Sequence, residues 1–291
     1  MTDINAPIAS RSSARHNDSM LNKLKRITTS AMLFIIAFVL SRVALQSMIA
    51  GISKLLDYQV RLTYNRVYVL PSDWHKWNRL RVFGIYVFPQ LVCLSVGLVI
   101  FSLIAHSTST TIKLYRVFLF WLSICLVNTF LSHLFFAPFG TGDFSSGYYQ
   151  TFSIMASWMY IKPMSMSVFS TFSIIAAILW GLVVCNEVLR YSYSSSLIKT
   201  KKGQRAIVVQ TFLLPVLLGF LPCMFLSKEF YLFPNLMMFM PLIFFWIGMM
   251  SKTTTDFAPI KGGKKDVLNH LPVIESIFAG GIWVAVWQFI K

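Results

Sequence analysis

Apolar residues occur along the chain in runs of roughly 20, separated by polar and basic segments. A helix that rises ~1.5 Å per residue needs roughly 20 residues to cross the ~30 Å hydrocarbon core of a bilayer. Strands of about ten residues with alternating polarity, typical of outer-membrane barrels, do not occur. The pattern predicts an all-α, polytopic membrane helix bundle with about seven transmembrane helices. The expected spans are about 27–50, 82–105, 114–137, 166–190, 206–226, 231–250 and 271–290.

The segment before the first span, residues 1–26, is rich in Ser, Asn and Arg. A cleavable signal peptide needs its basic region at the very start, directly before an apolar run. This segment is too long for that arrangement, so we expect a disordered, basic cytoplasmic tail, with a transit peptide as the alternative. Residues 27–291 are expected to form a single transmembrane domain.

The longest hydrophilic connection, residues 51–81, mixes six basic residues with aromatic and aliphatic ones. We expect it to be an ordered exterior segment, because a free linker needs no aromatic side chains. Trp74 and Trp77 are candidate interface residues. Residues 59–70 show partly alternating polarity, which indicates a short strand or an amphipathic piece. Residues 151–165 are apolar but too short to span, so we expect them to lie in the interface or to re-enter.

A non-helical stretch rich in Gly and aromatic residues is predicted after the third span. Pro138 ends that helix, and Asp143 lies in the middle of the stretch. Arg42 lies well inside the first span, where an arginine must face protein or water, or else snorkel to the headgroups. By depth, Arg42, His133 and Asp143 form a candidate polar cluster in the outer half of the bundle.

Two further carboxylates, Glu187 and Glu275, fall near the predicted cytoplasmic edge. We interpret both as facing the membrane interface. Along the helix axes they are too far from Arg42 to pair with it, so Asp143 is the best-placed partner for that arginine. The sequence therefore predicts an Arg42–Asp143 pair.

The composition agrees with a membrane location, since 56% of residues are hydrophobic and only 12% are charged, against about 25% in soluble domains. The net charge is +16. Of the 26 Lys and Arg residues, 16 lie in segments on the same side as the N-terminus and 9 on the other side. This bias predicts a cytoplasmic N-terminus, and we expect a bacterial inner membrane. We assign the basic charge to topology and contact with anionic lipids, and predict no nucleic-acid partner.

Motifs that carry catalytic or metal chemistry are missing from the sequence. It has no GxGxxG, Walker loop, HExxH or GxSxG pattern. The four cysteines lie one each in four apolar runs, and we expect buried, inert thiols. We therefore predict no catalytic residue, no metal site and no cofactor.

One short motif is similar to that of a known family. Pro138–Asp143, a proline followed by four residues and an aspartate, resembles the third core helix of site-2-protease-type intramembrane metalloproteases. The order of an early helix, a hairpin and this motif is also similar. Those enzymes need a His-Glu-x-x-His helix to hold zinc, and the first span here has no histidine. The resemblance implies a degenerate member without proteolytic activity or zinc.

Three functional classes follow from these patterns. Aromatic residues, Met and Arg are enriched at protein interfaces, which favours a non-catalytic subunit or scaffold of a larger membrane complex with partner membrane proteins. Proline-interrupted fifth and sixth spans favour a small-solute or ion transporter. The third class is the degenerate intramembrane-protease-like protein.

Overall fold

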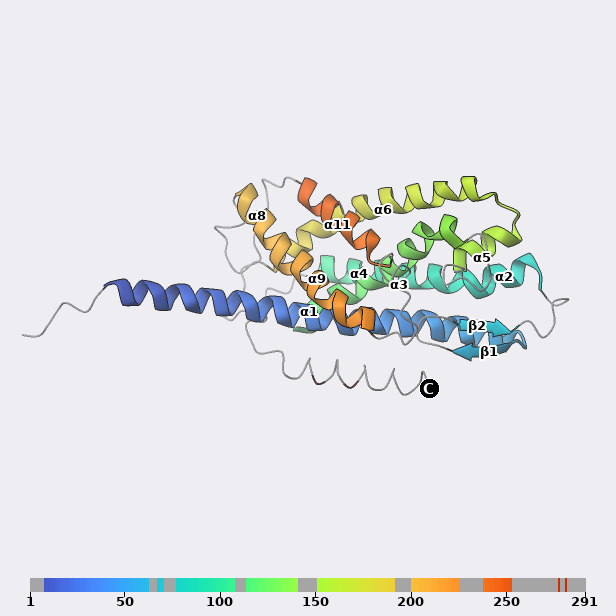
Figure 1. Ribbon diagram of the computed structural model, residues 1–291, viewed down its shortest axis with the longest axis horizontal. Helices are drawn as coiled ribbons and strands as arrows, with labels where there is room; N and C mark the ends of the chain where they lie inside the picture. Colours follow the sequence, from blue (N-terminus) through green and yellow to red (C-terminus); the bar gives the residue numbers. More distant parts are fainter. Residues whose placement is uncertain are drawn as a thin grey trace, which may run out of the picture.

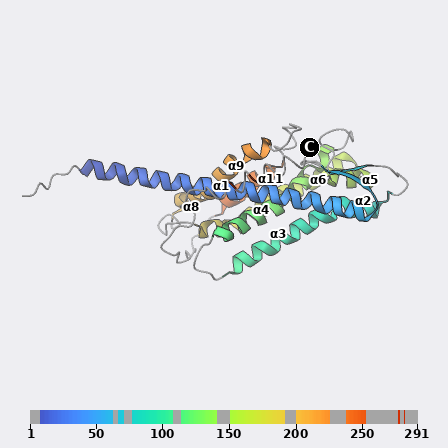
Figure 2. The same ribbon diagram turned by 90° about the horizontal axis from the view of Figure 1, so that it is seen from below.

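The computed structural model describes residues 8–62, 67–70, 77–107, 114–140, 151–191, 200–225 and 238–252, together with residues 277 and 281. It is an all-α bundle of roughly aligned helices, which confirms the predicted fold class (Figures 1 and 2). Five helical spans are long and apolar enough to cross a membrane: Met20–Leu55, Arg79–His106, Leu114–Phe135, Met164–Arg190 and Lys201–Cys223. They correspond to the first five predicted spans.

The sixth predicted span, 231–250, is described only as the short helix α11 (Met240–Ser251). Its 12 residues extend about 18 Å, less than a bilayer core. The seventh predicted span, 271–290, lies outside the described residues apart from residues 277 and 281. The total of seven spans stays a prediction.

Helix α1 (Ile8–Leu55) extends beyond the rest of the bundle at its N-terminal end (Figure 1). It begins inside the segment 1–26, for which we expected a disordered tail, so residues 8–26 differ from that expectation. Adding residues to an existing helix costs far less than nucleating one. The apolar C-terminal half of α1 therefore stabilises the helical conformation of the polar residues that precede it.

A β-hairpin follows α1. Asp57 turns the chain with a φ of 61°, and β1 (Gln59–Leu62) then pairs antiparallel with β2 (Val67–Leu70), with Val60 opposite Val69. Both strands contact α1. Of the two alternatives for residues 59–70, a short strand or an amphipathic piece, the described residues 59–62 and 67–70 form strands. The described parts of 51–81 pack on the bundle.

The next span consists of α2 (Arg79–Tyr86) and α3 (Phe88–His106). Asn78 caps α2 by accepting a hydrogen bond from the Arg81 backbone N–H at 2.9 Å. Pro89 lies in the first turn of α3, where no N–H is needed. Helix α4 (Leu114–Phe135) is the core of the bundle, with 83% of its span buried, and it contacts α1, α3 and α6.

After α4 comes a 3₁₀ turn, η2 (Ala137–Gly140), and then α5 (Thr151–Trp158). Helix α5 has 8 residues, too few to span a bilayer, and it packs on α2 and η2. The expectation that residues 151–165 lie in the interface or re-enter stays a prediction. Helix α6 (Pro163–Arg190) then returns along the edge of the bundle (Figure 1). Two of its hydroxyls, Ser170 and Ser173, donate to the Phe135 and Leu131 carbonyls of α4.

The fifth span is interrupted. It starts as α8 (Lys201–Val208), passes through the π-helical turn η3 (Val209–Leu213) and continues as α9 (Leu214–Phe225). Pro215 has no N–H to donate to the Thr211 carbonyl four residues earlier. Ser30 of α1 donates to that carbonyl at 3.4 Å, and the Trp121 indole of α4 donates to Ser30 at 2.9 Å. The carbonyl freed by the proline is thus satisfied from the neighbouring helices.

Candidate functional site

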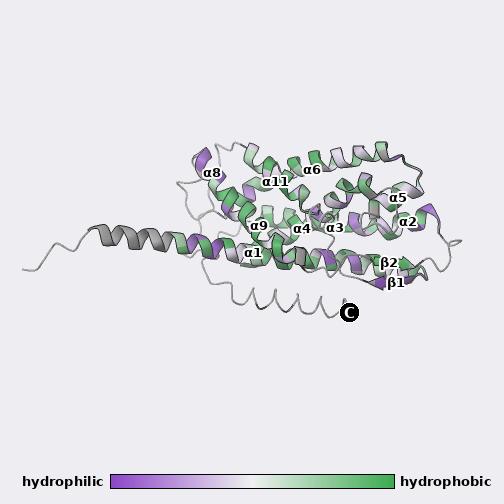
Figure 3. Cartoon of the chain, in the orientation of Figure 1, coloured by the Kyte–Doolittle hydropathy of each residue, from purple (hydrophilic) through white to green (hydrophobic). Residues whose placement is uncertain are grey.

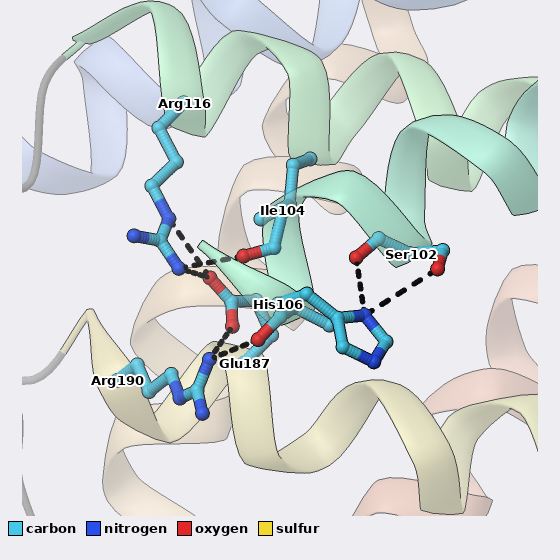
Figure 4. Close-up of polar contacts among 7 residues, drawn as sticks. Ser102, Ile104, His106, Arg116, Glu187 and Arg190 are labelled. Carbon is cyan, nitrogen blue, oxygen red and sulfur yellow. Dashed lines mark hydrogen bonds and ion pairs between the residues drawn. The ribbon is translucent and has the colours of Figure 1, made fainter. Parts of the chain in front are cut away.

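A buried ion cluster joins three helices at one end of the bundle (Figure 4). The Glu187 carboxylate of α6 accepts hydrogen bonds from Arg116 Nε at 3.2 Å and Nη2 at 3.0 Å. Its second oxygen accepts from Arg190 Nη1 at 3.0 Å. The side chains of Arg116 and Glu187 are 5% and 2% exposed, whereas that of Arg190 is 30% exposed.

The C-terminal end of α3 explains why the two arginines lie beside Glu187. The last carbonyls of a helix have no intrahelical N–H partner. In α3, the carbonyl of Ile104 accepts from Arg116 Nη2 at 2.9 Å, and the carbonyl of Ala105 accepts from Arg190 Nη1 at 3.0 Å. Both guanidinium groups therefore bridge Glu187 and the C-terminal turn of α3. The cluster connects the end of α3, the start of α4 and the end of α6.

The cluster carries one negative and two positive charges. The partial negative charge at the C-terminal ends of α3 and α6 offsets part of this excess. Just beyond the span, Tyr191 is buried against Phe120 with ring centroids 5.5 Å apart. Burial, followed by the neighbouring Glu187 carboxylate, raises the pKa of Tyr191 well above its usual value. The phenol stays protonated, so it adds no second negative charge beside Glu187.

Glu187 lies near the end of its helix, as predicted, but its environment differs from the prediction. We expected a carboxylate facing the membrane interface, and the structure buries it inside the bundle. The signal that we missed was the pairing of opposite charges by depth. Arg116 lies in the first turn of α4 and Glu187 in the last turn of α6, two helix ends that the predicted topology brings to the same side.

Arg42 of α1 is a second polar side chain inside the bundle, close to α4 and to the start of α11. It is 6% exposed, so it faces protein rather than snorkelling. Its Nη1 donates to the Met238 sulfur at 3.3 Å, and Asn128 Nδ2 of α4 donates to the Met238 carbonyl at 2.9 Å. Met238 therefore links the helices that carry Arg42 and Asn128.

The other members of the predicted polar cluster are only partly described. His133 is buried on α4, with 5% exposure. Asp143 lies outside the described residues, so the Arg42–Asp143 pair stays a prediction. Of the motif Pro138–Asp143, residues 138–140 belong to η2, and the rest is likewise outside the described part of the chain.

Trp77, a candidate interface residue, packs within its own chain. Its ring lies 4.8 Å from Tyr58, 6.3 Å from Tyr86 and 6.1 Å from Trp158, measured between centroids. These contacts join the turn after α1 to α2 and α5. Trp74 lies outside the described residues. Within the described residues, Trp77 thus packs against aromatic rings of its own chain, and its place at an interface stays a prediction.

The four cysteines are all buried and free, as predicted. Among the described residues, no three His, Cys, Asp or Glu side chains are grouped closely enough to hold a metal ion. No family model, curated protein or solved structure matches the chain.

Proposed function

We propose that this chain is a multi-pass integral membrane protein with a cytoplasmic N-terminus that serves as a non-catalytic subunit or scaffold of a larger membrane complex. Five apolar spans support the membrane location. Hydrogen bonds and ion pairs between the helices also support the proposal, because they hold the helices in fixed positions, as a scaffold requires.

The distribution of charge supports the orientation. Basic residues are concentrated at the end of the bundle that holds α8 and the N-terminal half of α1, and Figure 3 shows hydrophilic stretches in both elements. Cytoplasmic membrane boundaries are enriched in Lys and Arg. The basic residues described at this end are Lys23, Lys25, Arg26, Arg116, Arg190, Lys201, Lys202, Arg205 and Lys252.

The exposed face of α6 carries the subunit proposal. Of the five spans, α6 is the least buried within the chain, at 28%, and it lies along one edge of the bundle (Figure 1). Its N-terminal half presents Ser167 and Thr171, four residues apart, beside exposed Met164, Val168 and Phe172. Small residues at this spacing on a membrane helix allow a second helix to approach closely. We assign this face to a partner helix.

Replacement of the small residues tests this assignment. Ser167→Leu and Thr171→Leu make the face bulkier without hindering membrane insertion. Both hydroxyls donate only within α6, to the carbonyls of Met164 and Ser167, so neither change leaves an acceptor in another helix unpaired. We expect a stoichiometric membrane partner to co-purify with the wild type in mild detergent, and the double variant to lose it, as measured by native gel and mass spectrometry.

Ser95→Leu is the matched control. Ser95 is an exposed serine of another span, α3, and it donates to the Leu91 carbonyl in the same intrahelical manner. This variant should retain the partner. Purification of the wild type without a stoichiometric protein, or retention of the partner by the α6 double variant, would show that lipid covers this face.

Transport is the second candidate, favoured by the interruption of the fifth span at η3. Irregular turns within membrane helices often line transport pathways, and π turns often mark functional positions. Substrate-dependent uptake into vesicles by the purified chain alone would support transport over the subunit role.

A further inference from the structure

A hollow between α6, α8 and α11 has three basic side chains around an apolar floor. Lys201 and Arg205 of α8 and Lys252 after α11 supply the charges. The remaining lining residues are Cys185, Gln204, Val208, Met249 and Met250. Among the residues that the structure describes, no acidic side chain lines it.

The three cations are not neutralised within the described part of the chain. The Lys252 ammonium donates to the Leu182 carbonyl of α6 at 2.7 Å, which holds it at the hollow but leaves its charge uncompensated. Lys201 and Arg205 are exposed, and no described carboxylate forms an ion pair with either. Three like charges around one hollow repel one another, so an anion bound between them is stabilised.

The position of the hollow favours a lipid headgroup as the source of such an anion. It lies where α6 and α11 end and α8 begins, so it is at the boundary of the membrane spans. Lipid phosphates lie at this level, and basic pockets between membrane helices bind anionic headgroups on the cytoplasmic side.

The neighbouring surfaces suit a lipid. The floor residues Cys185, Val208 and Met249 are buried and apolar, so the hollow admits a headgroup only at its basic mouth. Toward the centre of the spans, α6 and α11 expose Val183 and Ile247. These faces can contact acyl chains while the phosphate lies between the cations. The N-terminus of α8, capped by Thr200, adds a partial positive charge at the same place.

We propose that this hollow is a binding site for the phosphate of an anionic phospholipid headgroup, held by Lys201, Arg205 and Lys252. The proposal rests on the membrane location of the chain but not on its role as a subunit. Its test therefore uses the purified full-length chain without any partner.

The experiment measures the midpoint of thermal unfolding in detergent on adding phosphatidylglycerol, phosphatidylcholine or inorganic phosphate. We expect phosphatidylglycerol to raise the midpoint of the wild type and the other two to leave it unchanged. The double variant Lys201→Gln/Arg205→Gln should lose this shift. Both replaced side chains are exposed, so the fold should be retained, which circular dichroism can verify.

Lys202→Gln is the matched control, because Lys202 is an exposed neighbour on α8 that does not line the hollow. It should keep the full phosphatidylglycerol shift. An equal loss in this control would show a general surface-charge effect and overturn the site. An equal shift with inorganic phosphate would overturn the lipid assignment. The absence of any shift in the wild type would overturn both.

Discussion

At the scale of single residues, burial separates the two arginines that share Glu187. Arg116 is almost completely enclosed, whereas Arg190 is about a third exposed. Breaking a buried ion pair leaves an unpaired charge away from water, while breaking an exposed pair costs little. The same carboxylate should therefore be coupled strongly to one arginine and weakly to the other.

We predict that Glu187→Gln and Arg116→Gln each destabilise the protein by about 3–5 kcal/mol, and that Arg190→Gln costs about 1 kcal/mol or less. The double variant Glu187→Gln/Arg116→Gln should cost less than the sum of its single changes, because neither charge is then left alone. Equilibrium unfolding in detergent measures all four. Equal costs for the two arginine variants would contradict the importance of burial.

At the scale of helices, the crossing of α6 and α11 depends on two glycines. A Cβ at Gly181 would lie 2.1 Å from the Phe245 carbonyl oxygen, and one at Gly248 would lie 2.1 Å from the Ile178 carbonyl oxygen. These neighbours are backbone atoms, which cannot rotate away. The two helices are therefore in direct backbone contact, as small residues permit in membrane bundles.

Gly181→Ala should force α6 and α11 apart and destabilise the protein by at least about 1–3 kcal/mol, the usual cost of overpacking. Gly51→Ala is the matched control. Gly51 is also within a helix, but a Cβ there meets nothing within 4 Å, so alanine should be neutral or stabilise by about 0.5–1 kcal/mol. Thermal unfolding compares the two, and a tolerated alanine at Gly181 would contradict the close crossing.

The sequence predicted which stretches form helices but not how the helices face one another. Five spans were located to within a few residues, apart from the extension of α1, because length and hydropathy determine whether a segment can cross a bilayer. Lipid and protein interior are both apolar, so hydropathy alone does not determine the rotation of a helix about its axis. The inward orientation of Glu187 and the Gly181–Gly248 contact depend on that rotation, and only the structure revealed them.

The buried polar residues likewise include features that the sequence predicted and features that only the structure revealed. The depth of Arg42 along its helix left two alternatives open, protein around the guanidinium or snorkelling to the headgroups, and the structure shows a buried side chain. Its contact with Met238 joins residues 196 positions apart, and no local pattern predicts such a pairing. For residues 59–70, in contrast, the local alternation of polarity already offered a strand as one of two alternatives, since side chains on successive strand residues point to opposite faces.

At the scale of the whole molecule, the bundle has two ends that can be labelled separately. Helix α8 and the start of α1 lie at one end, and α2 lies at the other (Figures 1 and 2). The exposed residues Met20 and Lys202 mark the first end, and exposed Leu80 marks the second. All four native cysteines are buried, so they should not react with a membrane-impermeant maleimide in the folded protein.

We predict that Leu80→Cys is labelled in intact cells, whereas Met20→Cys and Lys202→Cys are labelled only after the membrane is opened. The reason is the basic character of the end that holds Met20 and Lys202, which favours the cytoplasmic side. The unsubstituted protein is the control and should remain unlabelled in both conditions. The reverse pattern would place the N-terminus outside, and labelling of Leu80→Cys and Lys202→Cys from the same side would contradict the transmembrane arrangement of the bundle itself.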